Sequence, residues 1–364
     1  MYTQSKTSNT APAAVFLTIL LSLLLNRPTI ALAASPAKPR SDAVHQEEFC
    51  AQDFLPVSTA LTDLGADEYI RMDGAHTGFS GGLYPQGSNI PPVEHAAAGE
   101  RIARRIIPLD ANGQPDPQTG KVVIISVGMS NAGMEFATFR LQAQAQADIN
   151  PHLVLVNGAQ AGQTAEYWLD PAARTWQVVN ERLTSAGVTP LQVQVVWLKQ
   201  THTGSGDFPQ KAQTLQTDLT TIVQNLKTLF PNVQMVFLSS RTRSYTYWNG
   251  LSPEPAAFET GFAVKWLIEA QINGDPALNY DPARGEVRAP YLLWSAYLWA
   301  DGTNPRRDGF SWQPQDMVPD CTHPSNAGRA KIASLLLAFF RSDPAATPWF
   351  LNMSHFYLPL VARP

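Results

Sequence analysis

Charge of either sign is scarce in this chain of 364 residues, of which 15% are charged, with a formal net charge of −4. A nucleic-acid or anionic-lipid partner calls for a broad basic surface, which this composition does not provide. The seven histidines are dispersed, and neither an HExxH nor a paired-cysteine pattern occurs. Glycine-rich phosphate loops and a GxGxxG motif are also lacking. The sequence therefore predicts no metal ion, no cofactor and no nucleic acid, and favours a small-molecule or glycan partner.

Long apolar runs are confined to the N-terminus. Lys6 is followed by an apolar run over residues 13–25, and Ala31-Leu32-Ala33 then precedes Ala34. This is the pattern of a secretory signal with a small-residue cleavage site. The alternative is a membrane anchor, but the run is short against the roughly 20 residues that span a bilayer. We expect a signal peptide over residues 1–33, a secreted or periplasmic location, and no membrane contact after cleavage.

Cysteine is nearly absent, with Cys50 and Cys321 as the only two. In an oxidising compartment a bridge between them is expected, and it would brace the loop that contains His323. The alternative is a pair of unbridged buried thiols, because sequence does not show whether the two Cα atoms lie within disulfide range.

From Lys121 onward, β-branched apolar runs alternate with amphipathic patterns. The runs that predict strands are residues 122–127, 153–156, 193–198, 233–238 and 290–295. The helical patterns cover residues 133–148, 173–186, 211–230, 256–273 and 326–341. This alternation predicts an α/β fold in which helices cover both faces of a central parallel sheet.

The chain divides into four parts on these patterns. After the signal peptide, residues 34–120 are irregular and rich in Pro and Gly, with one helix expected over residues 92–105. We expect this segment to pack on a main domain at residues 121–342. Within the segment 34–120, the loop at residues 78–89 is either a lid over the site or a packing element. The tail, residues 343–364, is either a final edge strand or a sorting segment.

The candidate chemistry lies where the predicted strands end, because ligands bind outside the carboxyl ends of strands in open parallel sheets. Ser130 follows the first strand in a turn with Gly128, and a serine hydroxyl needs a base to act as a nucleophile. His323 is the only histidine with an aspartate three residues before it on a loop leading into a helix. Asp320 would set its tautomer. The alternative is that these residues have structural roles alone, with a strand-to-helix turn at Ser130 and a helix N-cap at Ser325.

Other polar residues share this rim. Backbone N–H groups after Ser130 and around Gly162 are candidate oxyanion donors. Lys199 and His202 are either substrate-binding or solvated loop residues. Arg241 and Arg243 would either hold a substrate carboxylate or lie on the surface. Three tryptophans precede the histidine loop and either stack on a sugar or belong to the core: Trp294, Trp299 and Trp312.

Three short motifs resemble those of a known family. GMSN at residues 128–131, NGAQAG at 157–162 and DCTH at 320–323 resemble the first, second and fifth sequence blocks of the SGNH (GDSL-type) hydrolases, over residues 121–342. The resemblance implies a flavodoxin-like three-layer α/β/α sandwich and metal-independent hydrolysis of esters. It also implies Ser130 as nucleophile, Gly162 as oxyanion glycine, and Asp320 with His323 as the rest of the triad.

The chain departs from that family in two places. Met129 stands where many members have Asp, whereas Asn131 matches the branch that contains sialate and xylan acetylesterases, which favours carbohydrate acetyl esters. The third block, Gly-x-Asn-Asp, appears here as Leu-Lys-Gln-Thr at residues 198–201. Either Gln200 replaces the missing asparagine, or that oxyanion donor is lost at a cost of about 10² to 10³ in rate.

Together these patterns predict a secreted serine esterase that removes acyl groups, acetyl above all, from a carbohydrate or similar alcohol. Its site would comprise Ser130, Asp320 and His323, with Gly162, Gln200, Asn131 and Lys199 as oxyanion or substrate-binding residues. Two alternatives remain open: a lipid or thioester hydrolase of the same fold, and a non-catalytic exported glycan-binding protein.

Overall fold

The computed structural model describes Cys50 and residues 55–352. The predicted signal peptide and the last twelve residues of the tail, 353–364, lie outside the described residues.

A parallel sheet of five strands forms the centre of the fold. Its strands are β3 (Val122–Gly128), β4 (Leu153–Asn157), β5 (Val193–Lys199), β6 (Met235–Leu238) and β7 (Tyr291–Trp294), in the spatial order β4-β3-β5-β6-β7. Every residue of β3, β5, β6 and β7 is buried, as expected for continuous apolar strands covered on both faces. All five strands predicted from the sequence are confirmed.

The helices follow the predicted pattern closely. They are α3 (Val93–Ala103), α4 (Ser130–Gln144), α5 (Arg174–Ser185), α6 (Gln210–Leu229), α7 (Ala256–Ile272) and α8 (Asn326–Ser342). Only α4 differs by more than two residues at its start, because the chain turns from β3 directly into the helix at Ser130. The predicted N-cap of α8 is confirmed: the Ser325 hydroxyl accepts a hydrogen bond from the Gly328 N–H.

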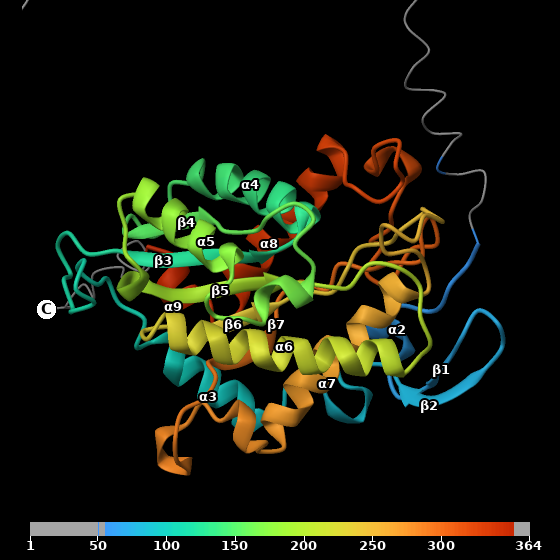
Figure 1. Ribbon diagram of the computed structural model, residues 1–364, viewed down its shortest axis with the longest axis horizontal. Coiled ribbons are helices and arrows are strands. Elements are labelled where there is room, and N and C mark those ends of the chain that lie inside the picture. The colour runs from blue at the N-terminus through green and yellow to red at the C-terminus, as the bar shows by residue number, and fades with distance from the viewer. Residues whose placement is uncertain (1–49, 51–54, 353–364) are drawn as a thin grey trace, which may run out of the picture. The chain divides into compact units, whose positions relative to one another are not determined.

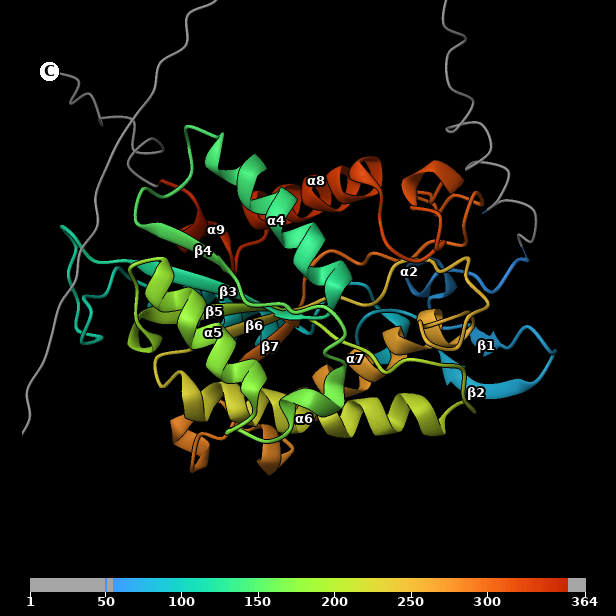
Figure 2. The ribbon, with the colours of Figure 1, turned by 45° about the horizontal axis from the view of Figure 1, so that its top comes forward.

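Two apolar cores lie on opposite faces of the sheet. One packs α5, α6 and α7 against side chains such as Val123 and Val196, and the other packs α3, α4 and α8 against side chains such as Ile124 and Val195. Figures 1 and 2 both show α4 above the sheet with α6 and α7 below it, and Figure 2 shows α8 on the same side as α4. The predicted three-layer α/β/α sandwich is confirmed. The alternation of side chains along each strand explains why neighbouring residues enter different cores.

The segment before β3 contains a short helix, α2 (Leu61–Leu64), and an antiparallel hairpin of β1 (Glu68–Ile70) and β2 (His76–Ser80). The sequence did not predict this hairpin, because its strands are too short to show a period. Beyond the hairpin, Leu83 and Tyr84 are buried, and the Leu83 carbonyl accepts a hydrogen bond from the Trp294 indole N–H at 2.6 Å. Of the two alternatives for this loop, these contacts favour packing.

Short 3₁₀ turns occupy Pro85–Gly87, Ala165–Trp168, Pro190–Gln192, Pro276–Leu278, Pro282–Arg284 and Pro314–Asp316. The described part of the tail forms α9 (Thr347–Phe350), and Leu351 then makes an isolated antiparallel bridge to Ile149. Among the described helices, none combines the length and apolar character that a bilayer crossing requires.

Candidate active site

The three residues predicted as a triad meet at the sheet rim. Ser130 Oγ lies 2.7 Å from His323 Nε2, and His323 Nδ1 lies 2.6 Å from Asp320 Oδ2. The separation along the chain between serine and histidine is 193 residues. With the ring proton on Nδ1 and donated to Asp320, the Nε2 lone pair faces the serine hydroxyl. The geometry is therefore that of a base hydrogen-bonded to a nucleophile.

Asp320 also organises the backbone of its own loop. Its Oδ1 accepts hydrogen bonds from the N–H groups of Thr322 and His323, at 3.0 and 2.9 Å. Burial acts to raise the pKa of Asp320, but these N–H groups and the imidazole lower it more, so the net direction is downward. The carboxyl is thus held in the charged form that orients an imidazole.

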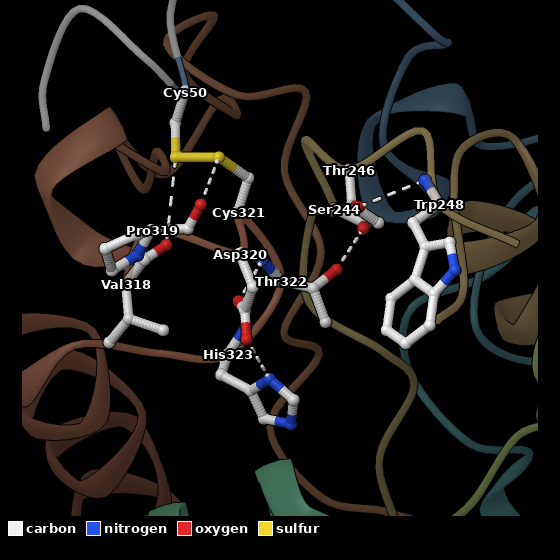
Figure 3. Close-up of a disulfide and its surroundings, with 10 residues drawn as sticks. All are labelled: Cys50, Ser244, Thr246, Trp248, Val318, Pro319, Asp320, Cys321, Thr322 and His323. Atoms are coloured by element: carbon white, nitrogen blue, oxygen red, sulfur yellow. Dashed lines mark hydrogen bonds and ion pairs between the residues drawn. A yellow bond between two sulfur atoms is a disulfide. The ribbon is translucent and has the colours of Figure 1, made fainter. Parts of the chain in front are cut away.

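The loop that carries the acid and the base is held by the predicted disulfide. Cys50 and Cys321 are bridged, with their Cα atoms 5.5 Å apart, which confirms the bridge (Figure 3). Cys321 has φ of 59°, a left-handed conformation that is costly for residues other than glycine. The bridge and a hydrogen bond from the Tyr245 N–H to the Cys321 carbonyl, at 2.8 Å, hold this residue in place.

The turn that presents Ser130 depends on close backbone packing. A Cβ at Gly128 would lie 2.4 Å from the Lys199 carbonyl oxygen and 2.6 Å from Ala132 Cβ, so only glycine fits there. The next residue after the serine, Asn131, is buried and donates from Nδ2 to the Thr322 carbonyl at 2.9 Å. Asn131 thus links α4 to the loop that contains His323.

The loop after β4 lies against the end of β3. The Ser126 hydroxyl accepts from the Gly158 N–H at 3.2 Å, and Gln160 N–H donates to the Gly128 carbonyl at 2.9 Å. Gly162 has φ of 71°, where glycine is favoured, and is exposed. Among the described residues, no hydrogen bond partner is found for the N–H groups of Gly162 and Ser130.

Gln200 is buried and lies next to this loop. Its Nε2 donates to the Gln163 carbonyl at 3.1 Å, and its Oε1 accepts from the Thr201 N–H at 3.3 Å. These contacts brace the segment that follows Gly162. Both polar atoms of the Gln200 side chain therefore have partners within the protein.

Lys199 requires a correction, because it is neither solvated nor open to a substrate. Its Nζ lies 2.6 Å from both carboxylate oxygens of Glu135, and the two side chains are 1% and 0% exposed. Burial lowers the pKa of Lys199 to about 8 and raises that of Glu135. The pair joins the end of β5 to α4, five residues beyond Ser130.

Three other basic side chains considered for substrate binding are paired or buried within the protein. Arg243 is buried and binds Asp301 at 2.7 Å, so it is neither a surface arginine nor a free carboxylate clamp. His202 contacts Asp218 at 2.7 Å between Nε2 and Oδ2. Arg241 is buried as well, and among the described residues its Nε has no hydrogen-bond partner. Asp320 is among the carboxylates that act on the Arg241 charge.

The three tryptophans considered as sugar-stacking residues belong to the core. Trp294, Trp299 and Trp312 are at most 2% exposed, and each indole N–H donates to a protein oxygen. A different tryptophan, Trp248, is 66% exposed on the loop after β6. The sequence contains a signal for this exposure, because Trp-Asn-Gly at residues 248–250 is typical of an exposed turn.

Neither of two sizeable cavities includes the triad in its lining. One of about 510 Å³ is lined by α3 and the segment that follows α7, and one of about 380 Å³ by residues 56–63 and 301–306. Ser130 is half-buried and the Asp320 side chain is 40% exposed, so the candidate triad lies at an open rim. In the part of the chain that the structure describes, no group of three His, Cys, Asp or Glu side chains is arranged to hold a metal ion.

No protein-family model matches the sequence, and no curated protein matches it at a significant level. Solved structures align only distantly. The periplasmic domain of a lipopolysaccharide acetyltransferase from Salmonella ser. Paratyphi A aligns at 11% identity, over 67% of this chain and 95% of its own, with a TM-score of 0.35.

Two carbohydrate esterases align at similar levels. A family two carbohydrate esterase from Clostridium thermocellum is 15% identical over 62% of this chain and 64% of its own, with a TM-score of 0.34. A carbohydrate acetylesterase from Xanthomonas citri is 12% identical over 61% and 56%, with a TM-score of 0.33. Likeness at this distance carries no functional information, so the function is inferred from the site.

Proposed function

We propose that this protein is a secreted or periplasmic serine esterase of the SGNH type that removes acetyl groups from a carbohydrate or similar alcohol. The observation that supports the proposal is the chain of contacts Ser130 Oγ, His323 Nε2, His323 Nδ1 and Asp320 Oδ2, at 2.7 and 2.6 Å. A nucleophile, a base and an orienting acid in this order are the parts that acyl transfer requires.

The reaction uses each group at a stated atom. Ser130 Oγ attacks the ester carbonyl while His323 Nε2 takes the hydroxyl proton, and Asp320 stabilises the imidazolium. The oxyanion accepts hydrogen bonds from the N–H groups of Ser130 and Gly162, with the N-terminus of α4 adding its dipole. His323 then protonates the departing alcohol oxygen. In the second half, His323 activates water, which hydrolyses the acyl-enzyme and frees Ser130.

The open position of the serine supports a short acyl group on a large alcohol. An acetyl group needs little enclosure, whereas a lipid hydrolase gains from an apolar acyl channel, and the two cavities above do not reach the triad. The closer rival within the enzyme class, a lipid or thioester hydrolase, is separated by a panel of esters from acetyl to palmitoyl. We expect turnover to fall steeply as the acyl chain lengthens.

The decisive test is fluorophosphonate labelling together with p-nitrophenyl acetate hydrolysis by the purified protein. We expect labelling and turnover in the wild type, and loss of both in Ser130→Ala. Ser185→Ala is the matched control, because this serine is exposed at the end of α5, away from the triad. A folded wild type that neither labels nor hydrolyses any ester would favour the glycan-binding alternative.

A further inference from the structure

Trp248 stands apart from the buried tryptophans because it is 66% exposed, on the loop between β6 and α7. Single exposed apolar residues are normal on a protein surface and need no explanation. An exposed tryptophan is a candidate for ligand contact only when its loop is linked to a candidate site.

The loop that carries Trp248 is tied to the catalytic loop. The Ser244 hydroxyl is hydrogen-bonded to the Thr322 hydroxyl, next to His323, and Tyr245 N–H donates to the Cys321 carbonyl. Trp248 is four residues beyond Ser244, so its Cα lies within about 14 Å of that anchor. In Figure 3 the Trp248 indole and the His323 imidazole both extend from their loops toward the lower part of the view.

One edge of the indole rests on the backbone of its own turn. A Cβ at Gly250 would lie 2.3 Å from Trp248 Cζ2 and 2.4 Å from Cε2, so the ring packs against the bare backbone of that glycine. The Trp248 carbonyl accepts from the Leu251 N–H at 3.0 Å. Further along, Asn249 Oδ1 accepts from the Ser205 hydroxyl at 3.1 Å. A ring supported in this way loses little freedom when a ligand covers it.

We propose that Trp248 is the stacking platform for a pyranose ring of the acylated substrate, an inference that rests on the proposed esterase function. A pyranose has an apolar C–H face, which covers an indole, and hydroxyl groups at its rim, which stay in water. An open platform suits such an amphipathic, uncharged ring. An acyl chain is apolar all round and gains more from an enclosed channel. The alcohol part of the ester then lies on Trp248 while the acyl carbonyl lies at Ser130.

The test compares two substrates in three variants. On partially acetylated xylotetraose, Trp248→Ala should raise KM about tenfold, equivalent to ~1.4 kcal/mol, with little change in kcat. On p-nitrophenyl acetate, which has no sugar ring, it should leave kcat/KM unchanged. Gly250→Ala should raise KM for the sugar ester, because the new methyl group displaces the indole. Leu141→Ala, at an exposed apolar residue of α4, is the control and should match the wild type.

Binding in the absence of turnover separates this inference from the proposed function. Calorimetric titration of Ser130→Ala with partially acetylated xylotetraose should give a measurable Kd, weakened about tenfold in Ser130→Ala/Trp248→Ala. If the wild type neither labels nor hydrolyses esters but this difference persists, the esterase is refuted and the platform stands. Equal binding by both variants, or an equal rise in KM on both substrates, overturns the platform. A loss confined to long-chain esters also overturns it and favours a lipid alcohol or acyl group.

Discussion

Removing one member of the Lys199–Glu135 ion pair should destabilise the protein far more than removing both. Lys199 Nζ lies 2.6 Å from both oxygens of Glu135, and the side chains are 1% and 0% exposed. In Lys199→Met the carboxylate stays buried without the cation that binds both of its oxygens, with Arg241 as a remaining positive charge that acts on it, or it is protonated at a cost. A buried pair broken in this way typically loses about 3–5 kcal/mol.

The double variant Lys199→Met/Glu135→Leu removes both charges and fills the same space with apolar atoms. Such replacements are often neutral or stabilising, so we expect it within about 2 kcal/mol of the wild type. Since a domain of ordinary stability unfolds with about 5–15 kcal/mol, the single variant should lose a large share of its stability and the double variant should not.

The measurement is urea unfolding of the oxidised protein, followed by tryptophan fluorescence and extrapolated linearly to water. The exposed pair Arg174–Glu181 is the control: its atoms are 2.5 Å apart, but its side chains are 64% and 59% exposed. Arg174→Ala should therefore cost less than about 1 kcal/mol. If Ser130 is the nucleophile as proposed, fluorophosphonate labelling should fall in Lys199→Met, because the pair anchors α4, the helix that begins at Ser130. A Lys199→Met variant within about 1 kcal/mol of the wild type, or a double variant as unstable as the sum of the singles, would refute this reasoning.

Three further predictions concern the loop that contains Asp320 and His323 and the turn before Ser130. If the proposed function holds, Asp320→Asn should lower kcat about 10⁴-fold, because the amide would leave His323 in the wrong tautomer. The pKa of Asp320 in the folded protein is lowered from its ordinary value of 3.8. The contribution of this carboxylate to stability is therefore present above pH 3.8 and is lost as the pH falls through the folded-state pKa. The free energies of unfolding of the wild type and Asp320→Asn should accordingly converge only in acid. Cys50→Ser/Cys321→Ser should lower the free energy of unfolding by about 2–4 kcal/mol and should reduce activity in addition. Gly128→Ala should reduce fluorophosphonate labelling, because its methyl group would lie 2.4 Å from the Lys199 carbonyl oxygen. Unchanged labelling would show that the backbone shifts to accommodate the methyl group.

The fold was predictable because its signals are local. Strands such as Val122–Gly128 are continuous β-branched runs, and helices such as Gln210–Leu229 repeat their apolar residues every three or four positions. The hairpin of β1 and β2 was not predictable, because three and five residues are too few to show a period. The start of α4 was placed three residues late, since only the packing around Gly128 decides where the turn ends.

The candidate triad was also visible in the sequence, because strand ends of a parallel sheet share one rim and a serine at that rim needs a histidine from another loop. The hydrogen-bond partners and the burial of the surrounding polar residues were not visible in the sequence. Lys199 is 64 residues from the glutamate that neutralises it, and Asn131 is 191 residues from the carbonyl it binds. No local pattern encodes such pairs.

The amino-acid sequence by itself determined the order of strands and helices, the class of the sheet and the three residues of the candidate triad, because periodicity and turn chemistry act between near neighbours. Only the tertiary structure decided which polar side chains are buried and which tryptophan is exposed. Trp294 and Trp248 are the same residue type on the same rim, and their opposite environments arise from contacts between segments far apart in the chain.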